Sequence, residues 1–413
     1  MLCALLSYSG STACAQPGTS PTCDMTPKYG SPDDMIQLRT RAWNLLLTIA
    51  NKPVVNSADW IPRQDAFAQA PRITTPTKSL TLFFAKEFDR AESSSPSAKA
   101  ALVPQPQTYE STFFNRSAYT HIRDRKYPLY SRATTKKLQI EESRGEIPEF
   151  PKDALVLKTF WRRVPDKGSV NVGVWKWNNI QKGTFRMLET MWPNPVCVEV
   201  KHTPNSKCVQ ARDAFYTITT TQENSPEFLC VASNPDCAPS IPKGQTMILV
   251  GMHVASKEKP EWFWATFWWQ GVDRQSGASP STASWTCDNA QRPSALGTGV
   301  WSNYSMDVRT RFADPKPPIT ADDSKTCGSP PTIGKNEELL ATYNPFIEGT
   351  SLLGFKSSCI DCHSRADTNA TPDTSVPQVC AVGGPNLTIF QGHVRTDYLW
   401  SIMRFLENTR SKP

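Results

Sequence analysis

The chain lacks the features that mark a membrane-spanning, repetitive or nucleic-acid-binding protein. No apolar run in its 413 residues approaches the roughly 20 that a helix needs to cross a bilayer. No segment recurs at a fixed period, which argues against a solenoid or a propeller. The formal charge is only +7, and the basic clusters at 123–126 and 136–137 are interrupted or short. We therefore expect no membrane span and no nucleic-acid partner.

The chain is also poor in histidine and in paired cysteines. It has five histidines, and its one Cys-x-x-Cys is formed by Cys359 and Cys362. A structural zinc site of this kind requires a second pair at similar spacing. A thioredoxin-like dithiol requires a βαβ setting, whereas the segment before Cys359 is rich in Ser and Gly. Neither alternative has support beyond the cysteine pair itself.

The chain does contain the pentapeptide Cys359-Ile360-Asp361-Cys362-His363. Cys-x-x-Cys-His is the spacing at which a haem is attached covalently, because two thiols one short turn apart can add to the two vinyl groups of one porphyrin. The adjoining imidazole then reaches the iron. The pattern predicts one haem c held by Cys359 and Cys362, with His363 as the proximal iron ligand.

The first fifteen residues predict export. An apolar stretch, Leu2–Leu6, is followed by small residues that end in Ala13-Cys14-Ala15, which is typical of the end of a secretory signal with its cleavage site. The apolar stretch is short and no basic segment precedes it, so a terminal segment without that role is the alternative. Haem attachment of this type takes place outside the cytoplasm, and we expect a periplasmic or secreted protein.

The remaining cysteines agree with export. Eight are left after the signal and the haem motif: Cys23, Cys197, Cys208, Cys230, Cys237, Cys287, Cys327 and Cys380. An even number outside the reducing cytosol predicts disulfides, although their spacing does not determine the connectivity. The pairs nearest in sequence are Cys197 with Cys208 and Cys230 with Cys237. Isolated buried thiols are the alternative.

Three regions follow the signal remnant at 1–15. Residues 16–150 begin with a capped amphipathic helix that ends near Ala50, and residues 86–150 show no periodicity and are expected to wrap a core irregularly. Residues 151–335 carry β-branched and aromatic runs typical of strands. Residues 336–413 are expected to form a haem c-binding segment, helical before the motif and again from Asp397 to Glu407.

The fold class that follows is α+β. We expect a β-rich body, either sandwich-like or one curved sheet, with the C-terminal helical haem c segment packed against it. A hairpin is predicted around the turn at 165–168, between strands at 154–161 and 170–175. A further strand, 262–269, carries aromatic side chains on both faces, which indicates a central, covered strand in which core packing is the expected role.

The strand at 246–255 carries the most interesting histidine. Strict alternation would place Met247, Leu249, Gly251, His253 and Ala255 on one face, where the glycine permits close approach of a planar group. His253 is therefore a candidate distal iron ligand, or an acid–base residue if the sixth position of the iron is open. A core histidine bonded to a neighbouring carbonyl is the alternative.

Other side chains could also occupy the distal side. The further histidines are His121, His202 and His393, and thioether sulfurs are available from Met306 and Met403. Met403 lies forty residues after His363 on the predicted terminal helix, in a position that also suits a core residue.

Four stretches together resemble a group of secreted bacterial cytochrome c family proteins with one haem motif near the C-terminus. They are Leu155–Trp161, Leu249–Lys257, Trp262–Phe267 and Leu340–Ala366. Members of that group read His-x-x-His-Lys around His253, whereas this chain reads Ala255-Ser256-Lys257 and has no second histidine there. The resemblance implies haem c binding and redox activity without a defined substrate.

Two functions are open on this basis. The first is an exported mono-haem c-type cytochrome in electron transfer, whose partner would be a redox protein or a small-molecule electron donor or acceptor. The second is a haem c-dependent oxidoreductase, a peroxidase or an oxygen-using enzyme, with an open distal pocket in the β-rich body. The second explains why more than 300 residues precede the motif. Nothing in the sequence indicates the oligomeric state.

Overall fold

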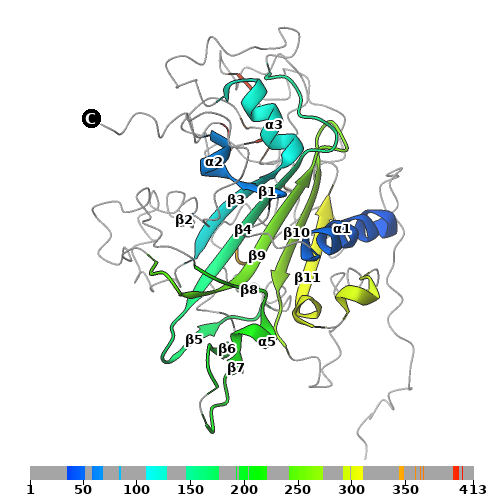
Figure 1. Cartoon of the computed structure of the whole chain (residues 1–413). Helices are drawn as coiled ribbons and strands as arrows, with labels where there is room; N and C mark the ends of the chain where they lie inside the picture. Colours follow the sequence, from blue (N-terminus) through cyan, green and yellow to red (C-terminus); the bar gives the residue numbers. More distant parts are fainter. Residues whose placement is uncertain are drawn as a thin grey trace, which may run out of the picture.

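A computed structural model of the chain places the described residues around one large β-sheet (Figure 1). It describes residues 35–51, 58–67, 83–84, 108–127, 146–175, 192, 195–202, 204–220, 241–272, 292–297, 299–309, 344–347, 359, 363, 366, 394–399 and 402. Several sequence-based expectations lie outside these residues: the signal at 1–15, the Cys230–Cys237 pair, Cys362, His393 and Met403. They stay predictions.

Eight strands form the large sheet, and every pairing within it is antiparallel. They are β1 Trp60–Pro62, β2 Phe83–Phe84, β3 Tyr109–Asn115, β4 Leu155–Val164, β8 Thr217–Thr219, β9 Thr246–Ser256, β10 Phe263–Trp269 and β11 Tyr304–Arg309. Their order is β1-β3-β4-β9-β10-β11, with β2 paired to β3 and β8 paired to β9. The expected β-rich body is confirmed, and β10 is an interior, fully buried strand.

A three-stranded sheet lies at one end of the large sheet (Figure 1). Its strands are β5 Ser169–Val172, β6 Val196–Glu199 and β7 Val209–Gln210. A disulfide joins Cys197 on β6 to Cys208, the residue before β7. One of the two cysteine pairs nearest in sequence is therefore bonded, and it ties together two strands that run parallel.

The hairpin predicted around residues 165–168 is wrong. β4 and β5 flank that turn, but β4 pairs with β3 and β9, whereas β5 pairs with β6. The reason is length: β4 has ten residues and can bond to long partners on both edges, while β5 has only four. The turn signal marks a true chain reversal between two sheets.

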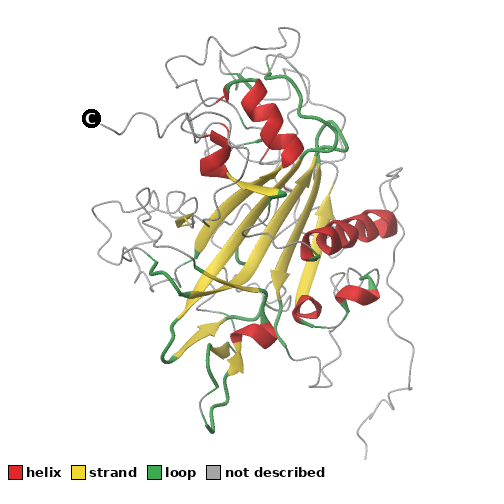
Figure 2. Ribbon diagram, viewed as in Figure 1, coloured by secondary structure: helices red, strands yellow, loops and turns green. Residues whose placement is uncertain are grey.

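The described helices are α1 Met35–Ala50, α2 Arg63–Phe67, α3 Arg116–Asp124 and α5 Ala211–Ala214, with short 3₁₀ turns at Ser294–Leu296 and Val300–Asn303. Figure 2 shows α1 beside the large sheet and α2 and α3 at one end of it. α1 confirms the helix expected to end at Ala50. The region expected to be irregular instead contains β3 and α3. α3 was missed because nine residues are too few for a clear helical period. The helix is stabilised by its N-cap residue Asn115, whose Oδ1 accepts from Ala118 N at 3.0 Å.

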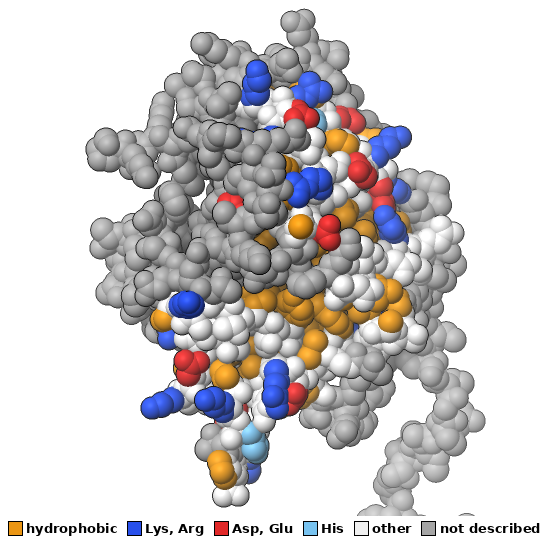
Figure 3. All heavy atoms as spheres, in the orientation of Figure 1, with side chains coloured by type: hydrophobic (Ala, Val, Ile, Leu, Met, Phe, Trp, Pro, Cys, Tyr) orange, Lys and Arg blue, Asp and Glu red, His pale blue; other side chains and the backbone are white. Residues whose placement is uncertain are grey.

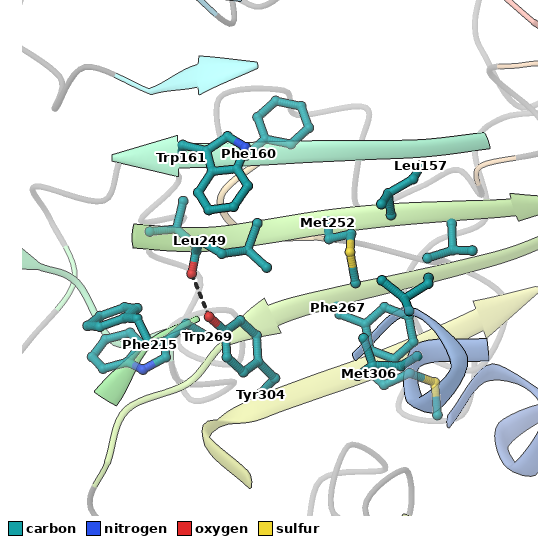
Figure 4. Packing of buried hydrophobic residues seen from close by; sticks show 14 of the residues in the cluster. Leu157, Phe160, Trp161, Phe215, Leu249, Met252, Phe267, Trp269, Tyr304 and Met306 are labelled. Atoms are coloured by element: carbon teal, nitrogen blue, oxygen red, sulfur yellow. Dashed lines mark hydrogen bonds between the residues drawn. The ribbon is translucent and has the colours of Figure 1, made fainter. Parts of the chain in front are cut away.

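The face of the sheet toward α1, which we call the helix face, carries the main hydrophobic core (Figure 4). Directly paired residues share a face of a sheet. One row across the helix face is therefore Phe113, Leu157, Val254, Ala265 and Val308. Trp43 of α1 packs edge-on against Phe267 with ring centroids 5.5 Å apart, which fastens the helix to this face.

A β-bulge divides β9 into two halves. Phe160 of β4 pairs with Gly251, but Trp161 pairs with Leu249, so Val250 is an extra residue. Positions 251, 253 and 255 consequently lie on one face of the sheet, and positions 247 and 249 lie on the other. The single face expected from 247 to 255 is therefore wrong, because alternation does not continue through a bulge.

The opposite face, which we call the motif face, has an apolar row beside a polar row. The apolar row is Phe114, Val156, Ala255 and Trp264. The polar row is Thr112, Lys158, His253, Thr266 and Asp307. The two rows are two residues apart along each strand, which is about 7 Å. α2 and α3 join the apolar row in a second hydrophobic cluster.

Charges of both signs are spread over the face of the molecule drawn in Figure 3, above and below a band of apolar side chains. This mixture agrees with the small net charge of +7. Among the helices in the described part of the chain, none combines the length and the apolar character required to cross a membrane.

The substitution Trp43→Ala tests whether α1 is an integral part of the core. Trp43 is fully buried against the helix face, so its removal should lower the free energy of unfolding by about 3 to 5 kcal/mol. Asn44→Ala, at an exposed position of the same helix, should change it by no more than about 0.5 kcal/mol. Urea unfolding monitored by tryptophan fluorescence measures both, and equal small effects would contradict the packing of α1.

Candidate functional site

Two residues of the Cys-x-x-Cys-His motif, Cys359 and His363, are described, and they lie against the motif face of the sheet. The His363 ring packs on Trp264 of β10, with centroids 4.3 Å apart and an interplanar angle of 42°. Cys359 is partly buried and packs against the second hydrophobic cluster, to which Trp264 also belongs. The structure thus brings the first cysteine and the histidine of the motif to the same hydrophobic cluster. Cys362 lies outside the described residues.

The His363 imidazole is oriented by a backbone carbonyl. Its Nδ1 lies 2.8 Å from the carbonyl oxygen of Tyr398. A carbonyl oxygen can only accept, so Nδ1 must carry the proton. In the neutral ring the lone pair is then on Nε2, the nitrogen that faces away from this bond.

Burial lowers the pKa of His363 to about 3, although the bond to the Tyr398 carbonyl raises it. The positive charge of Lys158 lowers it further, and a proton on the His253 ring would act in the same direction. Both side chains belong to the polar row, so charges in this row affect the pKa of His363. The imidazole is neutral at physiological pH, which is the form that binds a metal.

Backbone hydrogen bonds join His363 and Ala366 to the segment 394–399. Ala366 N donates to the carbonyl of His363 at 3.0 Å, and Thr396 N donates to the carbonyl of Ala366 at 2.8 Å. The segment 394–399 is in turn attached to 146–150, because Ile147 N donates to the Arg395 carbonyl at 2.9 Å. Three stretches that are far apart in sequence therefore meet beside His363.

Asp397 holds the turn that presents the Tyr398 carbonyl. Its Oδ1 accepts from Lys257 Nζ at 2.7 Å and from Trp262 Nε1 at 3.3 Å, and its Oδ2 accepts from Phe150 N at 2.9 Å. Asp397 and Lys257 are at most 2 % exposed, so their ion pair is shielded from water. Burial raises the pKa of Asp397 to about 6, against the effect of Lys257, which lowers it.

The backbone at this turn is strained. Asp397 has φ 45° and Tyr398 has φ 66°, in the left-handed region that side chains other than glycine seldom adopt. Each such residue costs on the order of 1 to 3 kcal/mol and persists only where its surroundings enforce it. The three donors on the Asp397 carboxylate supply that enforcement.

His253 lies at the centre of the polar row, between Lys158 on β4 and Thr266 on β10. It is partly buried, and its ring stands edge-on to Phe160 with centroids 6.2 Å apart. Lys158 forms an ion pair with Glu110 Oε2 at 3.2 Å. His253 is therefore on the face of the sheet against which His363 packs.

The space over Gly251 is not open to a planar group. A Cβ at Gly251 would lie 3.1 Å from Asn344 Oδ1 and 3.4 Å from Ile347 Cγ1. Asn344 is fixed there by hydrogen bonds from its Nδ2 to Thr266 Oγ1 and to the Phe267 carbonyl, at 2.8 and 2.9 Å. The expected role of this glycine is thus wrong, because the space above it accommodates residues 344–347.

The other candidate ligands in the described part of the chain lie elsewhere or are engaged by other groups. Met306 is on the helix face, where it pairs with Phe267, so the sheet separates it from His363. His202 is half-exposed beside the small sheet, 3.2 Å from Glu199 Oε1. His121 is buried on α3, with Nε2 3.2 Å from the Tyr127 hydroxyl and its ring 4.3 Å from Phe150.

The donor set fits a covalently attached haem. Iron-ligating imidazoles usually donate Nδ1–H to a backbone carbonyl in this way, which fixes the ring and leaves Nε2 for the metal. Trp264 and the apolar row form a buried apolar surface beside His363, and His253 lies in the neighbouring polar row. Cys359 would hold one vinyl group. Within the described ranges, no three side chains of His, Cys, Asp or Glu gather as a metal cluster.

Several residues of the site could not be found from the sequence. Asp397 was expected to begin a terminal helix and not to form an ion pair. Lys257 was noted only as the residue that follows a strand. Tyr398 contributes its backbone carbonyl, which is independent of its side chain. Lys257 and Asp397 are 140 positions apart, and no local pattern links them. One signal for the pair was available: Lys257 directly follows a mostly buried strand of eleven residues. A lysine in such a place is usually buried only when an anionic side chain pairs with it.

No protein-family model, curated protein or solved structure matches this chain. The interpretation of the site therefore depends on its own geometry.

The pH dependence of stability tests the environment of His121. Burial and the charge of Arg125 lower its pKa to about 4, against a bond to the Pro148 carbonyl that raises it. The unfolded chain, with a pKa near 6.5, then binds more protons than the folded chain between these values. The stability that this group contributes is present above pH 6.5 and is lost as the pH falls toward about 4.

Urea unfolding at several pH values in this window measures the loss. The variant His121→Gln can still bond to its neighbours but does not titrate, so its stability should fall less steeply with acid than that of the unaltered chain. Two parallel profiles would show that His121 is not buried as described.

Proposed function

We propose that the chain is an exported mono-haem c protein of electron transfer, similar to secreted bacterial cytochrome c family proteins. Its haem would be held by Cys359 and Cys362, with His363 as the proximal iron ligand. The observation that carries the proposal is the 2.8 Å contact between His363 Nδ1 and the Tyr398 carbonyl. It leaves Nε2 available to iron in a ring that is neutral and firmly oriented.

Three further observations support this function. Trp264 packs on His363 and would shield the proximal side from water. His253 lies on the same face of the sheet, in the polar row next to the apolar row of Trp264. Among the described residues it is the best-placed candidate for the sixth ligand. The Cys197–Cys208 disulfide is typical of an oxidising compartment such as the periplasm or the cell exterior.

The bound haem would supply a one-electron couple of iron. The residues of this chain would supply what tunes it: His363 and its carbonyl partner determine the electron donation of the axial ligand, and the buried apolar row lowers the local polarity. The partner would be a redox protein or a small-molecule electron donor or acceptor.

A haem c-dependent oxidoreductase is the second candidate. The observation that favours it is the polar row, in which Lys158 and Thr266 directly flank His253. Groups of this kind can hold or move a proton next to a reacting ligand. In that case His253 would act as an acid–base residue and would not bind the iron.

Covalent haem attachment is the first prediction of this proposal. The full chain, exported from a bacterial host that attaches haem to c-type cytochromes, should show one haem per chain in the pyridine haemochrome assay. The double variant Cys359→Ser with Cys362→Ser should lose the covalent haem. The double variant Cys197→Ser with Cys208→Ser, which removes the disulfide of the small sheet, should retain it. A chain that carries no haem would refute the proposal.

The spin state separates the two candidates. A six-coordinate carrier should be low-spin and should not bind carbon monoxide or cyanide, whereas an enzyme with an open position should be high-spin and bind both. If His253 is the sixth ligand, His253→Ala should convert a low-spin spectrum into a high-spin one that binds carbon monoxide. His202→Ala, on the small sheet, should leave the spectrum unchanged. Ligand binding by the unaltered protein would contradict the carrier function.

A further inference from the structure

We propose that the buried ion pair of Lys257 and Asp397 is a positioning device for the proximal histidine: it holds the Tyr398 carbonyl at His363 Nδ1 and thereby sets the reduction potential of the haem. The inference rests on the proposed function, and it concerns residues that belong to neither the haem motif nor the distal side.

The first step is the backbone. The Tyr398 carbonyl that accepts from His363 lies in a turn whose residues 397 and 398 both have positive φ, at 45° and 66°. Tyrosine has no intrinsic preference for this region. Something outside the turn must therefore select the conformation.

The second step is the Asp397 carboxylate. It receives donors from three different segments: Lys257 after β9, Trp262 at the start of β10, and Phe150 before β4. Two of these contacts are on Oδ1 and one is on Oδ2, so rotation of the carboxylate would break at least one of them. The position of Asp397 is therefore determined by the sheet. The next peptide, which carries the Tyr398 carbonyl, is held in the same turn, because Leu399 N donates to the Thr396 carbonyl at 2.9 Å.

The third step is the fixation of Lys257. Its Nζ also donates to the Pro260 carbonyl at 2.7 Å, and its backbone N donates to the Ala154 carbonyl at 3.0 Å. Glu149 is more distant, 3.9 Å from Nζ, and is about a third exposed. Lys257 is thus a rigid extension of the strand that carries His253, so one strand would influence the haem from both sides.

The function of such a pair is geometric more than stabilising. A buried ion pair gains little net stability because both charges lose their hydration, but its geometry is strict. A carbonyl held at Nδ1–H makes the imidazole a stronger electron donor, which favours the oxidised iron. Weakening that bond should raise the reduction potential.

The test is Asp397→Asn, which keeps the shape of the side chain and removes its charge. We expect a higher midpoint potential in spectroelectrochemistry of the haem-loaded chain. In ¹⁵N-histidine NMR of the reduced protein, the Nδ1–H signal of His363 should weaken or exchange faster. Lys257→Gln should shift both readouts in the same direction. The matched control Glu149→Gln, which removes the distant partner of Lys257, should change neither.

The NMR readout also works without haem. In the full chain with Cys359→Ser and Cys362→Ser, Asp397→Asn should reduce the population of the Nδ1–H tautomer of His363. A chain that fails to bind haem would refute the proposed function and leave this test in place. An unchanged tautomer and an unchanged potential in both Asp397→Asn and Lys257→Gln would overturn the positioning role.

Discussion

The structure depends on β9 being hydrogen-bonded along both edges. β4 pairs with it over its full length, β8 pairs with its first residues, and β10 pairs with the rest. A strand enclosed in this way has a determined register, and its register determines which side chains reach each face. The helix face and the motif face are both consequences of this pairing, and so is the position of His253 between Lys158 and Thr266.

The bulge at Val250 allows one strand to serve two purposes. Before it, Met247 and Leu249 complete the helix face; after it, His253 and Ala255 belong to the motif face. Without the extra residue, the two halves could not turn these sets to opposite faces. The strand ends at Ser256, and the next residue, Lys257, forms the ion pair with Asp397.

Much of the fold was predictable where a local pattern was long. The apolar spacing of α1 and the aromatic and β-branched runs of β9 and β10 identified these elements almost to the residue. β3 and α3 were missed because a seven-residue strand followed at once by a nine-residue helix has no sustained period. The pairing of β4 was also wrong, since a turn signal at 165–168 indicates that the chain reverses but does not indicate which strands bond.

The candidate site was predictable only in part. Cys359 and His363 stand out by spacing alone, and His253 by its place in an apolar strand. The partners of His363, by contrast, are a ring from β10 and a backbone carbonyl 35 positions away, and neither leaves a trace in the local sequence. The role of Gly251 was misjudged for the same reason, because the residue that approaches it, Asn344, comes from a distant segment.

By itself, the sequence determined that two thiols and an imidazole stand at the spacing of a covalent haem motif, since that spacing depends on a few adjacent residues. It also determined the alternating strands from which a sheet could form. Only the tertiary structure decided which side chains surround His363, which face His253 occupies, and that Lys257 meets Asp397. These are contacts between segments 35 to 140 positions apart, and they are selected by packing and by the burial of charge, which no short stretch of sequence encodes.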